Sequence, residues 1–143
     1  MRPAVSSEAA EGDDMSEEEM ARAEAIHEAT QLKLAALYRQ THEASNGQAM
    51  CIYERNALVS RIQAVKASME VLSQAQDRDG LNLPEGLLPL LKAQLLELEQ
   101  EKRESAERLD AATREVSRLR IEEMQNSAVL TAVNLLLSSR LQD

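Results

Sequence analysis

The chain has 143 residues, enough for one domain, yet aromatic residues make up only 1% of it: there are two tyrosines and neither phenylalanine nor tryptophan. Hydrophobic residues still account for 43% and charged residues for 29%. This composition is typical of long helices with narrow apolar stripes and excludes a thick globular core. The formal net charge of −9 argues against direct nucleic-acid binding, because neutralising phosphates requires clustered lysines and arginines.

The N-terminal segment, residues 1–15, is expected to be a disordered acidic tail. It combines Pro, Gly, Ser and acidic residues with little apolar surface to bury. It also lacks the basic and apolar stretches of a signal peptide, and no apolar run in the chain approaches the roughly 18 residues of a membrane span. The single cysteine, Cys51, cannot form an internal disulfide. We therefore expect an intracellular protein without membrane insertion.

Residues 16–76 are expected to form the first coiled-coil helix. Ser16 followed by Glu17, Glu18 and Glu19 is a capping-box pattern, so the helix should begin near Ser16. Asn46-Gly47 leaves open one continuous helix or two, since a glycine inside a helix costs about 1 kcal/mol. A heptad register passes through this segment at Met20, Ala23, His27, Thr30, Leu34, Leu37, Thr41, Ala44, Gln48, Cys51, Arg55, Leu58, Ile62, Val65, Met69 and Leu72.

Residues 77–86 hold two of the four glycines and one of the three prolines, which predicts a turn. Because Pro84 and Pro89 are tolerated only near a helix start, a second coiled-coil helix should begin between Pro84 and Leu88 and cover 87–126. An apolar C-terminal helix, 127–143, should follow for partner docking. The register of this half runs through Leu88, Leu91, Leu95, Leu98, Lys102, Ser105, Leu109, Ala112, Val116, Leu119, Glu123, Asn126, Leu130, Val133 and Leu137.

The predicted fold class is all-α: long coiled-coil helices forming an antiparallel helical hairpin within a hetero-oligomeric bundle. Polar register residues such as His27, Gln48 and Arg55 disfavour a homodimeric rod, because identical chains would stack them against their own copies. Apolar residues surround most of the C-terminal helix, which favours burial against a partner over capping of its own bundle. The predicted partner-binding residues are Leu58, Ile62, Val65, Met69, Leu72, Leu88, Leu91, Leu95, Leu98, Leu130, Val133, Leu135, Leu136 and Leu137.

No pattern in the sequence points to catalysis or to a cofactor. His27-Glu28 and His42-Glu43 resemble each other, but a zinc-protease helix needs a second histidine four residues after the first, and neither site has one. Cys51 has no histidine near it in sequence and falls on the heptad register, as a small hydrophobic residue would. We therefore expect neither an enzyme nor a metal site, and no cofactor.

The segment Asn134-Leu135-Leu136-Leu137-Ser138-Ser139-Arg140-Leu141-Gln142 resembles the C-terminal ending of the centromere protein H family, whose pattern runs roughly Asn-Leu-Ile-Leu-Gly-Ser-Lys-Val-Asn. Ser138 stands where that family has Gly. The family is a coiled-coil subunit of the inner kinetochore. Carried over to this chain, the resemblance makes Leu135, Leu136, Leu137 and Ser139 the packing core of the ending.

The resemblance implies a non-enzymatic scaffold subunit of the inner kinetochore, located in the nucleus at centromeres. It further implies a heteromer with centromere protein K that docks on centromere protein I and links centromeric chromatin proteins to the outer kinetochore in chromosome segregation. The alternative function is a coiled-coil adaptor or tether on vesicles or lysosome-related organelles. Such adaptors and tethers are also built from short coiled-coil chains.

Overall fold

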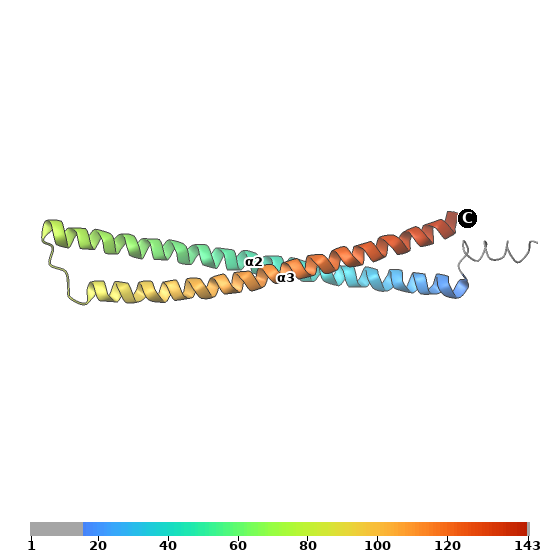
Figure 1. Ribbon diagram of the computed structural model, residues 1–143, viewed down its shortest axis with the longest axis horizontal. Helices are drawn as coiled ribbons and strands as arrows, with labels where there is room; N and C mark the ends of the chain where they lie inside the picture. Colours follow the sequence, from blue (N-terminus) through green and yellow to red (C-terminus); the bar gives the residue numbers. More distant parts are fainter. Residues whose placement is uncertain (1–15, 143) are drawn as a thin grey trace, which may run out of the picture. The chain divides into compact units, whose positions relative to one another are not determined.

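The computed structural model describes residues 16–142, with side chains described up to Ser139; the predicted tail, 1–15, lies outside the described residues. The described chain consists of two helices, α2 (Glu17–Asp79) and α3 (Leu87–Gln142), joined by residues 80–86 (Figure 1). No strand occurs within 16–142. The prediction of an all-α antiparallel helical hairpin is confirmed.

Ser16 caps the start of α2. Its Oγ accepts a hydrogen bond from the Glu19 amide at 3.1 Å, and its carbonyl oxygen accepts from the Met20 amide at 2.9 Å. The three glutamates of the first turn place negative charge beside the exposed amides of the helix start. The capping pattern in the sequence therefore located the beginning of α2 to within one residue.

α2 is a single helix that runs through Gly47 without a break and ends at Asp79, three residues later than the predicted 76. A Cβ added at Gly47 would meet nothing within 4 Å, so no close packing requires the glycine. The heptad register on both sides of Gly47 keeps one face of α2 against α3, and that packing outweighs the cost of about 1 kcal/mol for a glycine in a helix.

The connection between the helices is built on Gly80. Gly80 has φ of +66°, in the left-handed region that glycine adopts without strain, and it terminates α2. The following Leu81 amide donates to the Ala75 carbonyl at 3.1 Å, which turns the chain back across the helix end. The Leu87 amide then donates to the Pro84 carbonyl at 3.1 Å. α3 therefore begins at Leu87, inside the predicted interval, with Pro89 in its first turn where no amide is needed.

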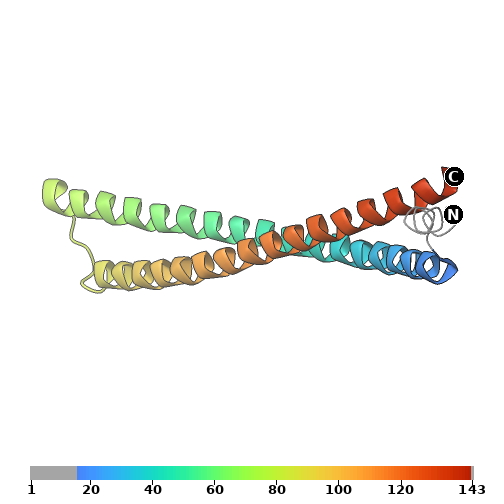
Figure 2. The same cartoon turned by 45° about the vertical axis from the view of Figure 1, so that its right-hand side comes forward.

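The two helices form two compact units. Unit 1 comprises residues 16–42 and 117–142, and unit 2 comprises residues 43–116 with the connection. Within each unit, a segment of α2 lies antiparallel to a segment of α3, and both ribbon views agree on this pairing (Figures 1 and 2).

The predicted heptad register matches the buried face of both helices. Every register residue of α2 is buried or half-buried, and so is every register residue of α3 except Lys102. Lys102 is exposed, because a long lysine side chain can leave the interface and keep its ammonium group in water. We call these register residues the seam.

The seam carries the core of both units. Burial of a leucine of this kind is worth about 1.5–3 kcal/mol. In unit 1 the buried residues are Ala23, Thr30, Leu34, Leu37 and Leu119. In unit 2 they are Leu58, Ile62, Leu98, Ser105 and Val116.

Candidate functional site

Nine of the predicted partner-binding residues lie on the seam of unit 2. Leu58, Ile62 and Leu98 form its buried cluster, with Val65 and Leu95 packed against them. The other four are half-buried: Met69, Leu72, Leu88 and Leu91. The hairpin thus packs five of the nine against one another between its own two helices. The other four keep part of their surface exposed, and contact of any of the nine with a partner stays a prediction.

The predicted C-terminal docking residues divide between two faces of α3. Leu130, Val133 and Leu137 are half-buried on the seam of unit 1. Leu135 and Leu136 are exposed, with 68% and 47% of their surface accessible. Residues 127–142 are not a separate helix, because α3 runs from Leu87 to Gln142 without interruption.

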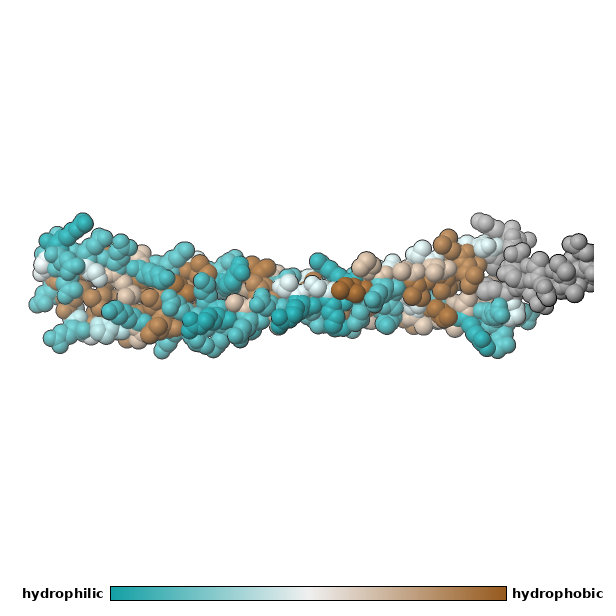
Figure 3. Space-filling view, viewed as in Figure 1, coloured by the Kyte–Doolittle hydropathy of each residue, from teal (hydrophilic) through white to brown (hydrophobic). Residues whose placement is uncertain are grey.

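Leu135 and Leu136 belong to a larger apolar surface on the side of α3 away from the seam. We call it the C-terminal face and define it by its exposed members Ile121, Met124, Ala128, Val129, Ala132, Leu135 and Leu136. Between Glu123 and Arg140 the sequence has no charged residue. Figure 3 shows apolar side chains interrupting the polar surface near the described ends of the two helices in unit 1.

Ile121 and Met124 were missed by the sequence analysis, although a signal for them exists. Both lie off the heptad register, and both continue the stripe of Leu135 and Ala128 at helical spacing. Contiguous exposed apolar patches of this kind mark interaction surfaces. The C-terminal face is therefore the best candidate for partner contact in unit 1.

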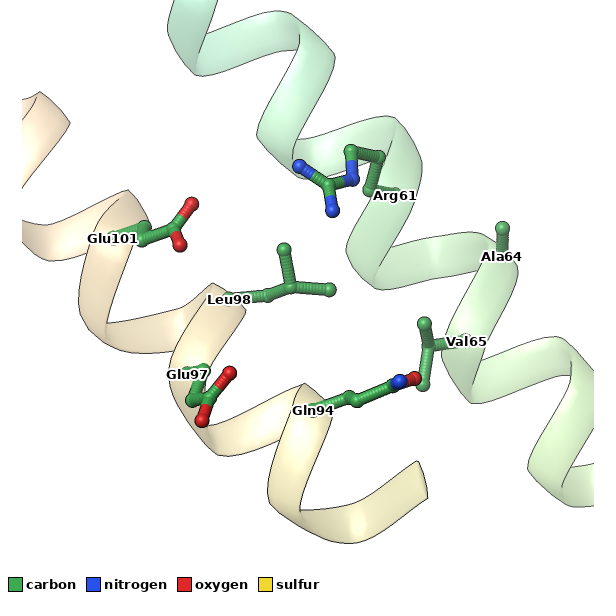
Figure 4. A pocket seen from close by; sticks show the side chains of 7 residues that line it. All are labelled: Arg61, Ala64, Val65, Gln94, Glu97, Leu98 and Glu101. Carbon is green, nitrogen blue, oxygen red and sulfur yellow. The ribbon is translucent and has the colours of Figure 1, made fainter. Parts of the chain in front are cut away.

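A second candidate surface lies in unit 2, on one flank of the hairpin. A cavity of about 380 Å³ opens between α2 and α3 and is lined by Arg61, Ala64, Val65, Gln94, Glu97, Leu98 and Glu101. Figure 4 shows Leu98 and Gln94 reaching from α3 toward α2, while Arg61 reaches back from α2.

A neighbouring cavity of about 300 Å³ extends this surface, and it shares Arg61 and Glu101 with the first. It is lined by Tyr53, Glu54, Ala57, Leu58, Arg61, Glu101 and Arg108. We call the two cavities together the Arg61 groove. The groove was not predicted from the sequence, because its two sides come from different helices.

Polar contacts cross between the helices beside the seam. In unit 2, Arg108 lies 3.8 Å from Glu54, Lys66 lies 3.8 Å from Glu99, and the Gln48 amide donates to the Thr113 hydroxyl at 3.1 Å. Both ion pairs are largely exposed, so each adds about 0–1 kcal/mol to stability. The apolar seam, and not these contacts, therefore contributes most of the stability of the unit.

The described residues contain no group of three or more His, Cys, Asp or Glu side chains that could hold a metal ion. His27 is half-buried at its seam position and His42 is exposed. Cys51 is a free, half-buried thiol. Neither α2 nor α3 contains a stretch that is both long and apolar enough to cross a membrane.

Comparison with known proteins identified no relative of this chain. The chain matches no family model, and neither a curated protein nor a solved structure matches it.

Proposed function

We propose that this chain is a non-enzymatic scaffold subunit that binds the helices of other proteins, and that the C-terminal face is its main contact. One observation carries this proposal. The seam already buries or half-buries the register leucines within the chain, yet α3 presents a second, uncharged apolar side at Ile121, Met124, Val129, Leu135 and Leu136. A helix with apolar residues on opposite sides is normally covered on both.

The assembly that we propose is the inner kinetochore, with centromere proteins K and I as partners. The support is the resemblance of residues 134–142 to the ending of centromere protein H. That segment overlaps the C-terminal face, because Leu135 and Leu136 are the exposed leucines within it. As a kinetochore subunit, the chain would act in the nucleus and link centromeric chromatin proteins to the outer kinetochore.

Binding of the full chain to purified centromere proteins K and I tests both statements. A double variant, Leu135→Glu with Leu136→Glu, places two charges on the C-terminal face without touching the seam. The matched control, Ser127→Glu with Ser138→Glu, adds the same two charges at exposed positions of the same helical segment. Loss of a central interface anchor commonly costs about 2 kcal/mol, or roughly 30-fold in affinity.

We expect the leucine variant to lose at least that much affinity, and the serine variant to bind like the original chain. Circular dichroism should show equal helicity in all three proteins. If the original chain binds neither protein K nor protein I, the kinetochore assignment is wrong. If it binds them and the leucine variant binds equally well, the C-terminal face is not the contact. Recovery of vesicle-tether subunits with the tagged chain would support the alternative function.

A further inference from the structure

The Arg61 groove has the surface of a helix-binding site, on a different part of the chain from the C-terminal face. On its α2 side, Ala57, Arg61 and Ala64 line the groove at heptad spacing, each one residue before a seam position. All three are exposed, and two of them are alanines with short side chains. Short side chains let the backbone of another helix approach closely, as at interfaces between packed helices. Leu58, Val65 and Leu98 supply the apolar floor of the two cavities.

The charges of the groove are not balanced within the chain. Glu54 is paired with Arg108 at 3.8 Å. Glu97 and Glu101, which stand one helical turn apart on α3, line the groove and make no ion pair with any residue in 16–139. Arg61 also lines it and is likewise unpaired within that range. Two carboxylates on the α3 edge therefore face one guanidinium group on the α2 edge.

We propose that the Arg61 groove binds a helix from a partner protein, and that this helix carries a stripe of Ala and Leu bordered, on the edge facing α3, by lysines or arginines spaced four residues apart. The spacing of four matches Glu97 and Glu101. An acidic or neutral residue on the other edge of the partner helix would face Arg61. Opposite charges across such an interface fix the register and direction of the bound helix.

A second copy of the chain fits this groove poorly. The net charge is −9, and a two-fold contact that places α3 against α3 would bring the Glu97 and Glu101 edge of one copy close to that of the other. Like charges placed opposite each other cost affinity and exclude wrong partners. The charge pattern thus selects a partner that is basic where this chain is acidic.

Two designed helical peptides of about four heptads can probe the groove directly. Both carry an Ala and Leu stripe with glutamine on one edge, and the other edge is lysine in one peptide and glutamate in the second. We expect the full chain to bind the lysine peptide at least about tenfold more tightly than the glutamate peptide near 50 mM salt, and expect the difference to shrink as salt screens the contact. Fluorescence anisotropy of labelled peptides gives both affinities.

General attraction between a basic peptide and an acidic protein needs its own control. Glu97→Lys with Glu101→Lys changes the charge of the groove, whereas Glu107→Lys with Asp110→Lys changes the net charge equally at exposed positions of α3 that line neither cavity. The groove variant should prefer the glutamate peptide, and the control should keep the preference for lysine. An equal loss of preference in both variants would mean non-specific attraction and would overturn the proposal.

Steric blocking provides a second, charge-independent test. Ala64→Trp fills the groove from an exposed position, and Ala111→Trp adds the same side chain at an exposed position of α3 outside both cavities. Only Ala64→Trp should weaken binding of the lysine peptide, by tenfold or more. Failure of the original chain to bind the lysine peptide would overturn the proposal. The proposal would also be overturned if sedimentation showed a dimer that Ala64→Trp dissociates, because a second copy of the chain would then occupy the groove. Neither result bears on the C-terminal face, which none of these variants touches.

Discussion

The Thr41 hydroxyl donates a hydrogen bond to a Glu123 carboxylate oxygen across the seam of unit 1. Both residues occupy register positions where a two-stranded coiled coil usually has apolar side chains, and both are half-buried. The hydrogen bond satisfies these two side chains with each other, and it can form in only one alignment of α2 against α3 in this unit. A polar pair within an apolar seam selects register at some cost in stability.

Substitutions of Thr41 and Glu123 should separate the contribution of the pair to helix register from its contribution to stability. Thr41→Val removes the donor and leaves the half-buried carboxylate without it, so we expect a loss of about 1–2 kcal/mol in the free energy of unfolding. Thr41→Leu together with Glu123→Leu should instead stabilise the chain by about 1–2 kcal/mol, because an apolar pair replaces a polar one. Urea unfolding followed by circular dichroism measures both. A double variant less stable than Thr41→Val would show that the polar pair contributes more than register.

At Ser105, removal of a polar group should stabilise the chain. Its side chain is fully buried in unit 2, and its Oγ has no hydrogen-bond partner. Ser105→Ala removes an unsatisfied hydroxyl and improves helix propensity, so the free energy of unfolding should rise by about 1 kcal/mol. Ser105→Leu should lower it by about 1–3 kcal/mol, because a larger side chain must displace the neighbours that bury Ser105 completely. A destabilised Ser105→Ala variant, in the same unfolding experiment, would mean that the hydroxyl is hydrogen-bonded in solution.

Two glycines, Gly80 and Gly47, should respond to alanine in opposite ways. Gly80 has φ of +66°, which an alanine adopts only with strain, so Gly80→Ala should destabilise the chain by about 1 kcal/mol. Gly47 lies inside α2 with open space around it, so Gly47→Ala should stabilise the chain by about 1 kcal/mol. Thermal melts of the two variants, compared at equal protein concentration, check the contrast. Stabilisation by both changes would argue against the left-handed conformation at Gly80.

The helix cap at Ser16 can be tested by comparing a substitution that removes the hydrogen-bond acceptor with one that keeps it. Ser16→Ala removes the acceptor for the Glu19 amide, and we expect a loss of about 1 kcal/mol. Ser16→Asp keeps an acceptor and should restore the stability of the original chain. Both can be read from urea unfolding, with fraying of the first turn visible as faster amide hydrogen exchange near Glu19. Equal stability of the alanine and aspartate variants would show that the cap contributes nothing measurable.

The sequence by itself determined the helices and the face that each one buries. Leu34 and Leu37 on α2, and Val116 and Leu119 on α3, repeat with the heptad spacing, and that spacing alone places them on one side of a helix. Ser16 and Pro84 located the two helix starts, because capping and turn geometry depend on neighbouring residues. The end of α2 was predicted three residues too early, at 76 instead of Asp79. Lys102 occupies a register position and is nevertheless exposed, because the register does not show whether a long side chain leaves the interface.

Only the tertiary structure decided which surfaces remain open. The sequence made Leu58, Ile62 and Leu98 candidates for a partner, whereas the hairpin packs them against one another. It could not reveal the Arg61 groove, whose lining combines Ala64 of α2 with Glu97 of α3. The spacing along one helix defines an apolar stripe, but the exposure of a stripe depends on which helix the turn brings beside it. That pairing is a property of the folded chain, because it joins residues that lie far apart in the sequence.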